Sequence, residues 1–181
     1  MDTGGMIFWA VIIIGALIYF IMKAPKAIIS LEGSKDKKFE DEFIKIKFIF
    51  NTEIEFANLN TLKSIGFEIE NISSSPIFID WDNSIFIDPD GKPKKVMHLE
   101  NIEFNKKSIQ KPTLIEPDSN LIEGVVPVDN IDWPKGEDNP KPLPLLKAWK
   151  SKRSFLFRFL LVLKIEKNNK PYEFDFAVSK V

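Results

Sequence analysis

The sequence predicts a mainly β domain, an immunoglobulin-like β-sandwich, preceded by one transmembrane α-helix. Apolar and polar residues alternate with a period of two over much of residues 43–181, and turn-forming residues separate these stretches. This pattern is typical of half-buried strands, and seven or eight short strands joined by turns are typical of sandwiches. Residues 6–22 are an uninterrupted apolar run. We therefore expect an anchor at 1–23, a charged tether at 24–42 and a β domain at 43–181.

The apolar run from Met6 to Met22 contains no charged residue. With its flanks it approaches the roughly 20 residues that span a hydrocarbon core. Trp9 and Tyr19 lie near its two ends, where aromatic rings favour the headgroup level. A cleaved signal peptide is disfavoured, because the only charged residue before the run is Asp2 and the residues at 24–27, Ala-Pro-Lys-Ala, make a poor cleavage site. The run has no polar face, so a buried core helix is also disfavoured.

Lysines follow the apolar run, whereas no Lys or Arg precedes it. The lysines close behind it are Lys23, Lys26, Lys35, Lys37 and Lys38. The positive-inside rule then places the C-terminal domain on the cytoplasmic side of the cell (inner) membrane. An extracytoplasmic domain is the alternative.

The first predicted strands follow one another between residues 43 and 81. Residues 43–50 alternate lysines with apolar side chains, and residues 65–70 repeat the alternation with glutamates outward. A serine-rich turn at 73–76 precedes a strand at 77–81.

A hairpin is predicted from strands at 84–87 and 95–99. Residues 88–91 between them read Asp-Pro-Asp-Gly. Asp first, Pro second and Gly fourth are the residues that a type I turn favours.

The C-terminal part predicts a strand at 121–126, a long proline-rich loop at 134–144 and a hairpin of strands at 155–165 and 172–178. Residues 155–165 are nearly all apolar. They are too few for a second membrane span and include Arg158, so we expect a central strand that is buried on both faces.

Composition excludes several classes of function. The chain has no cysteine, which rules out disulfides, thiol nucleophiles and cysteine-ligated metals. Its 25 basic and 26 acidic residues leave no broad basic field for nucleic acid. No nucleophile elbow, phosphate-binding loop or dinucleotide fingerprint is present. The one histidine, His98, lies in a predicted strand with no nucleophile or orienting acid at a recognisable spacing. We expect no catalysis and no cofactor.

Asp80, Asp82, Asp88 and Asp90 are the densest acidic cluster. Hard oxygen ligands around a turn can hold calcium. The spacing does not match an EF-hand loop, and turn chemistry already explains Asp88 and Asp90. Turn formation is therefore the favoured interpretation, with a calcium site as the alternative.

Trp133 and Trp149 flank the proline-rich loop that contains Pro142 and Pro144. Tryptophan is enriched at interface hot spots, and such proline stretches can adopt polyproline II and dock in an aromatic groove. These four residues are our candidates for partner binding. Core packing is the alternative for the tryptophans, and a stiff connection for the prolines. Trp81, in the middle of a strand, is expected in the core.

Residues 65–133 carry a hairpin reading FEIENISSSPIFIDWDNSIFIDPDGKPKKVMH and then PTLIEPDSNLIEGVVPVDNIDW. Together they resemble a group of bacterial lipoproteins and membrane-anchored proteins of unassigned function. The matching positions are Asn71, Pro76, Ile77, Ile79, Trp81, Ser84, Asp88, Gly91, His98, Ile115, Pro117, Ser119 and Pro127. The resemblance covers under half of the chain. It implies an extracytoplasmic-type β-sandwich held at a membrane and brings no catalytic residues. This chain lacks the lipobox cysteine, and the predicted helix takes its place.

These observations predict a single-pass, membrane-anchored, non-catalytic binding or scaffold module that serves as an accessory subunit of a membrane protein complex. Its expected partners are the lipid bilayer and a membrane protein, and not nucleic acid. The alternative is a membrane-tethered ligand- or calcium-binding sensor that uses residues 80–90. A hydrolase that uses His98 is the weakest hypothesis.

Overall fold

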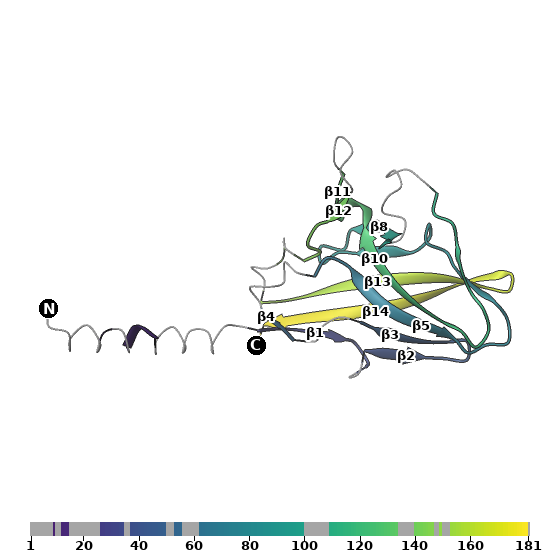
Figure 1. Ribbon diagram of the computed structural model, residues 1–181, viewed down its shortest axis with the longest axis horizontal. Helices are drawn as coiled ribbons and strands as arrows, with labels where there is room; N and C mark the ends of the chain where they lie inside the picture. Colours follow the sequence, from purple (N-terminus) through teal and green to yellow (C-terminus); the bar gives the residue numbers. More distant parts are fainter. Residues whose placement is uncertain are drawn as a thin grey trace.

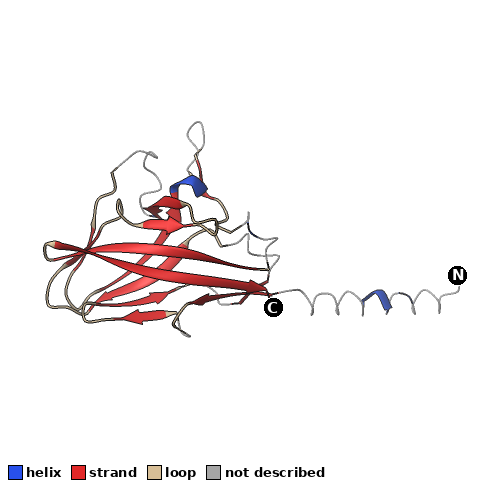
Figure 2. Ribbon diagram, turned by 180° about the vertical axis from the view of Figure 1, so that it is seen from behind, coloured by secondary structure: helices blue, strands red, loops and turns tan. Residues whose placement is uncertain are grey.

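The computed structural model describes residues 9, 12–14, 26–34, 37–49, 53–55, 62–99, 109–133, 140–146, 149 and 153–180. Strands make up most of this part of the chain, which confirms the mainly β class (Figure 2). A 3-10 turn, η3 (Val128–Asn130), follows β10. The strands are β1 (Lys26–Leu31), β2 (Lys38–Glu40), β3 (Ile44–Phe48), β4 (Glu53–Glu55), β5 (Ile65–Asn71), β6 (Ile77–Ile79), β7 (Ile85–Ile87), β8 (Pro93–His98), β9 (Thr113–Ile115), β10 (Asn120–Pro127), β11 (Ile131–Asp132), β12 (Lys141–Pro142), β13 (Ser154–Ile165) and β14 (Asn168–Lys180).

Most of these strands form one continuous sheet that folds back on itself (Figure 1). Their order is β2-β3-β5-β10-β8-β7-β13-β14-β1-β4, with β6 beside β13, β9 beside β6, and β11–β12 as a separate pair. The β7–β8 hairpin joins the two layers, because β7 pairs with β13 and β8 pairs with β10. An immunoglobulin-like sandwich consists of two separate sheets packed face to face. The hydrogen-bonded path between the layers therefore does not support this finer expectation.

The core lies between the two layers and is rich in phenylalanine. Phe48 of β3 contacts both Phe174 and Phe176 of β14, with ring centroids 4.9 Å apart in each pair. Phe67 of β5 faces Phe159 of β13 at 5.8 Å. Edge-to-face and tilted aromatic pairs contribute beyond the area that they bury. The period-two pattern thus places every second side chain of these strands in one shared core.

The segment 24–42 is not a tether but contributes two strands. β1 pairs with β14 on one side and with β4 on the other, and its Ala27 and Ile29 are fully buried. Phe39 of β2 packs edge-to-face against Tyr172. Among the described residues, the buried core cluster draws on residues 27–178.

In the part of the chain that the structure describes, no helix is long and apolar enough to cross a membrane. The predicted anchor lies mostly outside the described residues: within it, only Trp9 and residues 12–14 are described, as helix. It therefore remains a prediction. Ala27 of β1 is opposite Lys180 of β14, so the chain enters the domain at the end where β14 finishes (Figure 1).

Both predicted hairpins are present. In the β7–β8 hairpin the Gly91 amide donates to the Asp88 carbonyl at 2.8 Å, and Gly91 has a positive φ of 77°, which glycine adopts without strain. β13 and β14 pair along their whole length. β13 is central, as expected, but it is buried on both faces only at residues 161–163. Elsewhere along β13, buried and more exposed side chains alternate, because one face of the sheet meets solvent.

The proline-rich loop contains a short piece of sheet. β12 pairs with β11 through the register Ile131↔Pro142, which corrects the expectation of a fully irregular 134–144. Proline is tolerated there because the pair has only two strands and both are at an edge. Residues 134–139 lie outside the described residues.

Buried polar side chains hold the turns between strands. The Asn71 amide donates to the carbonyls of Ser75 and Ile115, at 2.9 Å each. Ser84 is buried and accepts a hydrogen bond from the Val162 amide at 3.0 Å. Asn71 and Ser84, two positions of the hairpin motif, therefore satisfy buried backbone groups, which would otherwise be costly to desolvate.

Asp41 connects the β2–β3 turn to β14. One carboxylate oxygen accepts from the Lys170 ammonium at 2.9 Å and from the Tyr172 hydroxyl at 3.0 Å, and the other accepts from the amides of Phe43 and Ile44. Burial alone raises the pKa of Asp41. The hydrogen bonds from Lys170, the two amides and Tyr172 together outweigh burial, so its pKa lies below the ordinary value.

Replacing Asp41 by asparagine should lower the free energy of unfolding by about 2 kcal/mol at pH 7, because charge-assisted hydrogen bonds are lost. A depressed folded-state pKa stabilises the protein above the unfolded value of 3.8. That contribution disappears as pH falls through the folded-state pKa. Urea unfolding should therefore show a wild-type advantage that shrinks below about pH 4. Glu42→Gln, at the exposed neighbour, is the control; an equal Asp41→Asn deficit at both pH values would contradict this account.

Candidate functional site

A pocket of about 480 Å³ lies on the outer face of the sheet, near the tip of the β13–β14 hairpin. Strand register brings three of its lining residues into one row: Phe78 on β6, Lys164 on β13 and Asn169 on β14. Leu114 on β9 continues this row beside the pocket. The residues lining the pocket are Phe78, Asp80, Asp82, Ile109, Gln110, Pro112, Lys164 and Asn169.

Three apolar side chains are exposed at this pocket or beside it. Phe78 is 37% exposed, Leu114 45% and Ile109 85%. Apolar side chains that gather on a surface, rather than occurring singly, mark interaction sites. We call Phe78, Ile109 and Leu114 the distal apolar surface, because they lie at the opposite end of the domain from the start of β1. No sequence motif marks these residues. The one available signal is the strand at 77–79, whose three residues are all apolar, so that an apolar side chain lies on each face of the sheet.

The acidic rim of the pocket is tied to the protein itself. Asp80 accepts from the side-chain amide of Asn83 at 2.7 Å. Asp82 forms an ion pair with Lys95 at 2.6 Å. These contacts hold Asp80 and Asp82 in place and occupy part of their hydrogen-bonding capacity. A molecule in the pocket would therefore be bound mainly through apolar contacts.

The structure does not bring the four predicted aspartates together into a metal site. Asp80 and Asp82 line the pocket, whereas Asp88 is buried in the β7–β8 turn. There it accepts from the amides of Asp90 and Lys92 at 2.9 Å each, as the turn interpretation expects. Among the described residues, no three acidic or histidine side chains gather closely enough to hold a metal ion. The calcium alternative therefore has no geometric support here.

His98 lies inside the core and pairs with an acid that the sequence analysis missed. Its ring stacks on Trp81 with centroids 5.0 Å apart, and its Nδ1 is 3.8 Å from Oε2 of Glu123. Both side chains are buried, and both ring nitrogens are shielded from solvent. Gln110 accepts from the His98 amide and donates to the Val96 carbonyl. This placement favours the structural interpretation of His98, and fully buried Trp81 confirms the expectation for that residue.

The two tryptophans beside the proline-rich loop pack against the domain. Trp149 is only 7% exposed and belongs to the core, as the core-packing alternative expects, so it is not available to a partner. Leu145 and Leu146, shortly before it in the sequence, are buried as well. Trp133 is partly buried against the core, and its indole donates to the Val128 carbonyl at 3.3 Å.

The two candidate prolines form part of the same local structure. Pro142 pairs with Ile131 in the β11–β12 sheet, and the Pro144 carbonyl accepts from the Asn130 side chain at 3.1 Å. Both are partly exposed. The backbone of this segment forms its hydrogen bonds within the domain, as expected if the prolines serve as a stiff connection.

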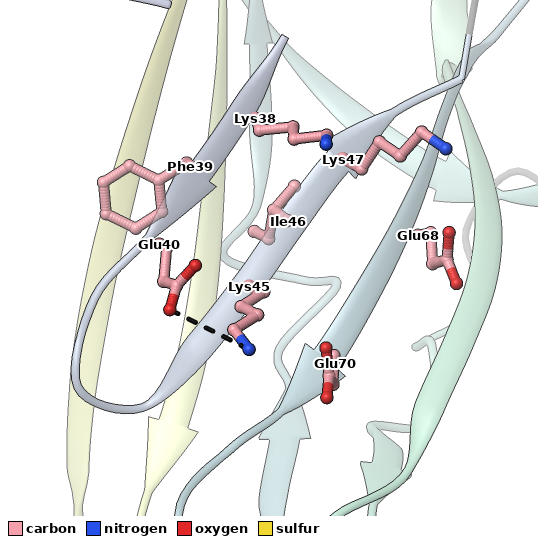
Figure 3. A pocket seen from close by; sticks show the side chains of 8 residues that line it. All are labelled: Lys38, Phe39, Glu40, Lys45, Ile46, Lys47, Glu68 and Glu70. Atoms are coloured by element: carbon pink, nitrogen blue, oxygen red, sulfur yellow. Dashed lines mark ion pairs between the residues drawn. The ribbon is translucent and has the colours of Figure 1, made fainter. Parts of the chain in front are cut away.

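A second pocket, of about 380 Å³, lies on the outer face of β2, β3 and β5 (Figure 3). It is lined by Lys38, Phe39, Glu40, Lys45, Ile46, Lys47, Glu68 and Glu70. Opposite charges face one another across the strands, Glu40 and Glu70 beside Lys45, and Glu68 beside Lys47. Such an exposed ladder neutralises itself and contributes little energy. We read it as a solubilising face, not as a site for a charged ligand.

Comparisons with known proteins do not assign this chain to a family. No protein-family model matches it, and no curated protein matches it. A crystal structure of a protein from Archaeoglobus fulgidus is similar at a TM-score of 0.29 and 10% identity, over 84% of this chain and 96% of that one. A TM-score this low supports no inference about function. The fold and pocket define a mainly β domain with an exposed apolar surface at one end, and the lipoprotein resemblance remains a prediction.

Proposed function

We propose that this chain is a single-pass, membrane-anchored, non-catalytic binding module that contacts a membrane-protein partner through the distal apolar surface. The observation that carries the proposal is the exposure of Phe78, Ile109 and Leu114 together beside a pocket of about 480 Å³. Covering such side chains removes apolar area from water, which favours association. The uncharged run at 6–22 supports the anchor.

The distance between this surface and the start of the domain supports an accessory-subunit role. β13 begins at Ser154, at the end of the domain where β1 starts, and runs to the opposite end (Figure 1). Lys164, near the far end of β13, lines the pocket. At about 3.3 Å per residue, the pocket lies roughly 33 Å from the end where the chain enters. A partner would therefore meet the domain well away from the bilayer. We place the domain on the cytoplasmic side, from the lysines that follow the anchor; the lipoprotein resemblance favours the other side.

The double variant Phe78→Ser/Leu114→Ser should lose the partner. Isolation of the full chain from its own membranes in mild detergent should recover a partner with the wild type and at least about tenfold less with the variant, since interface hot spots are each worth about 2 kcal/mol. The amount of each co-purified protein, measured by quantitative mass spectrometry, provides the comparison.

Ile122→Ser/Leu156→Ser is the matched control, because both side chains are exposed on other parts of the sheet. It should recover the partner as the wild type does. Recovery of the wild type as a lone monomer, or equal recovery by the two double variants, would refute the proposal.

A further inference from the structure

Two polar side chains of the pocket of about 480 Å³ carry hydrogen-bond donors that the described part of the protein does not use. Lys164 and Asn169 are exposed and lie opposite each other on β13 and β14. Within the described ranges, neither side chain forms a hydrogen bond or an ion pair. A lysine ammonium group can only donate, and an asparagine side chain donates through its amide nitrogen. This side of the pocket therefore offers donors to a bound group.

The acidic side chains of the same pocket already have partners. Asp80 accepts from the backbone and side-chain amides of Asn83, at 3.2 and 2.7 Å. Asp82 is paired with Lys95 at 2.6 Å. Because the donors are unused while the acids are engaged, a carboxylate is the group that complements this pocket. Asn83 is neutral, so Asp80 keeps its charge and disfavours a carboxylate on its own side of the pocket.

Strand register fixes how far such a carboxylate would lie from the apolar side chains. Lys164 is opposite Phe78 of β6, and Phe78 is opposite Leu114 of β9. Neighbouring strands are about 4.8 Å apart, so the backbone of Phe78 lies about 5 Å and that of Leu114 about 10 Å from Lys164. The row is thus polar where it crosses β13 and β14 and apolar where it crosses β6 and β9.

We propose that the protein partner of the distal apolar surface presents an aspartate or glutamate next to a large apolar side chain; this rests on the proposed function. The apolar side chain covers Phe78 and Leu114, and the carboxylate, about 5 to 10 Å away, accepts from Lys164 and Asn169. A partner that covered Lys164 with apolar groups alone would leave its ammonium group desolvated and unpaired, which opposes association.

Charge reversal at Lys164 tests the inference. The full chain is isolated from its own membranes in mild detergent, and the co-purified partner is quantified by mass spectrometry. Lys164→Glu places like charges together and should recover at least about tenfold less partner than the wild type. Lys164→Arg keeps the charge and should stay within about twofold. Lys141→Glu, the same reversal at an exposed lysine of the separate β11–β12 pair, is the matched control and should recover the partner as the wild type does.

Coupling with a water-soluble carbodiimide provides a second readout, because this reagent joins an amine directly to a carboxylate that it contacts. In the wild-type complex, a cross-link should join Lys164 to an aspartate or glutamate of the partner. Lys45 and Glu40, 3.8 Å apart on the outer face of β2 and β3, should be joined in every sample and so show that the reagent reacted.

Equal recovery by Lys164→Glu and the wild type would overturn this inference. So would a complex in which Lys45 and Glu40 are joined and Lys164 has no link to the partner. If Phe78→Ser/Leu114→Ser still loses the partner in either case, the proposed function stands. Recovery of the wild type as a lone monomer would overturn the proposed function and this inference with it.

Discussion

Replacing Phe176 by alanine should lower the free energy of unfolding by about 4 kcal/mol, within the range for truncating a buried phenylalanine. Phe176 is fully buried on β14. Its ring lies 4.9 Å from Phe48 of the opposite layer, edge to face, and 4.9 Å from Phe157 of the neighbouring strand, stacked. The truncation removes contacts both within one layer and between the two. The close-packed core relaxes only partly into the space that is left.

Urea unfolding followed by circular dichroism would measure this loss. Phe78→Ala is the matched control, because it deletes the same atoms from a partly exposed ring on the outer face. We expect the control to lose less than about half of what Phe176→Ala loses. Similar losses for the two variants would mean that the aromatic contacts between the layers are not the main source of stability.

Replacing either His98 or Glu123 alone by leucine should cost about 2 kcal/mol or more, since each change puts an apolar group against the other buried polar side chain. The Nδ1 of His98 is 3.8 Å from Oε2 of Glu123, and both side chains are buried. Replacing both residues with apolar side chains removes the desolvation cost of each. The double variant His98→Leu/Glu123→Leu should therefore recover a large part of the stability that either single variant loses.

A double-mutant cycle on unfolding free energies would measure the coupling. The control cycle uses Lys45 and Glu40, an exposed pair 3.8 Å apart, for which we expect less than about 1 kcal/mol. Because the two pairs have the same separation, the difference between their coupling energies measures the effect of burial. Additive losses at His98 and Glu123 would show that the two side chains act independently in the core.

Local pattern was sufficient to predict several elements. Ile44 and Ile46 are buried and Lys47 is exposed, as the alternation in residues 43–50 predicted. Turn chemistry alone located the β7–β8 hairpin. β1 was missed because its apolar alternation is short and lies among lysines and acids. Its partner is also remote: the Ser30 hydroxyl bonds to Ala177, 147 residues away, and no local signal reports such a pairing.

The candidate site depended still more on long-range register. Phe78 and Leu114 become neighbours only because β6 pairs with β9, and Lys164 joins them only because β6 also pairs with β13. Trp149 was a candidate for partner binding with core packing as the alternative, and the tertiary structure decided between them by burying its ring.

By itself the sequence determined the mainly β class, the hairpins and the absence of cysteine chemistry, because strand period, turn residues and composition are local properties. It also supplied the apolar run from which the anchor is predicted. Only the tertiary structure decided that the sheet is continuous through β7–β8, that Glu123 meets His98 in the core, and that exposed apolar side chains gather beside the pocket. The physical reason is that each of these features depends on which distant strands pair and in what register, and a shift of one residue would turn every side chain to the other face.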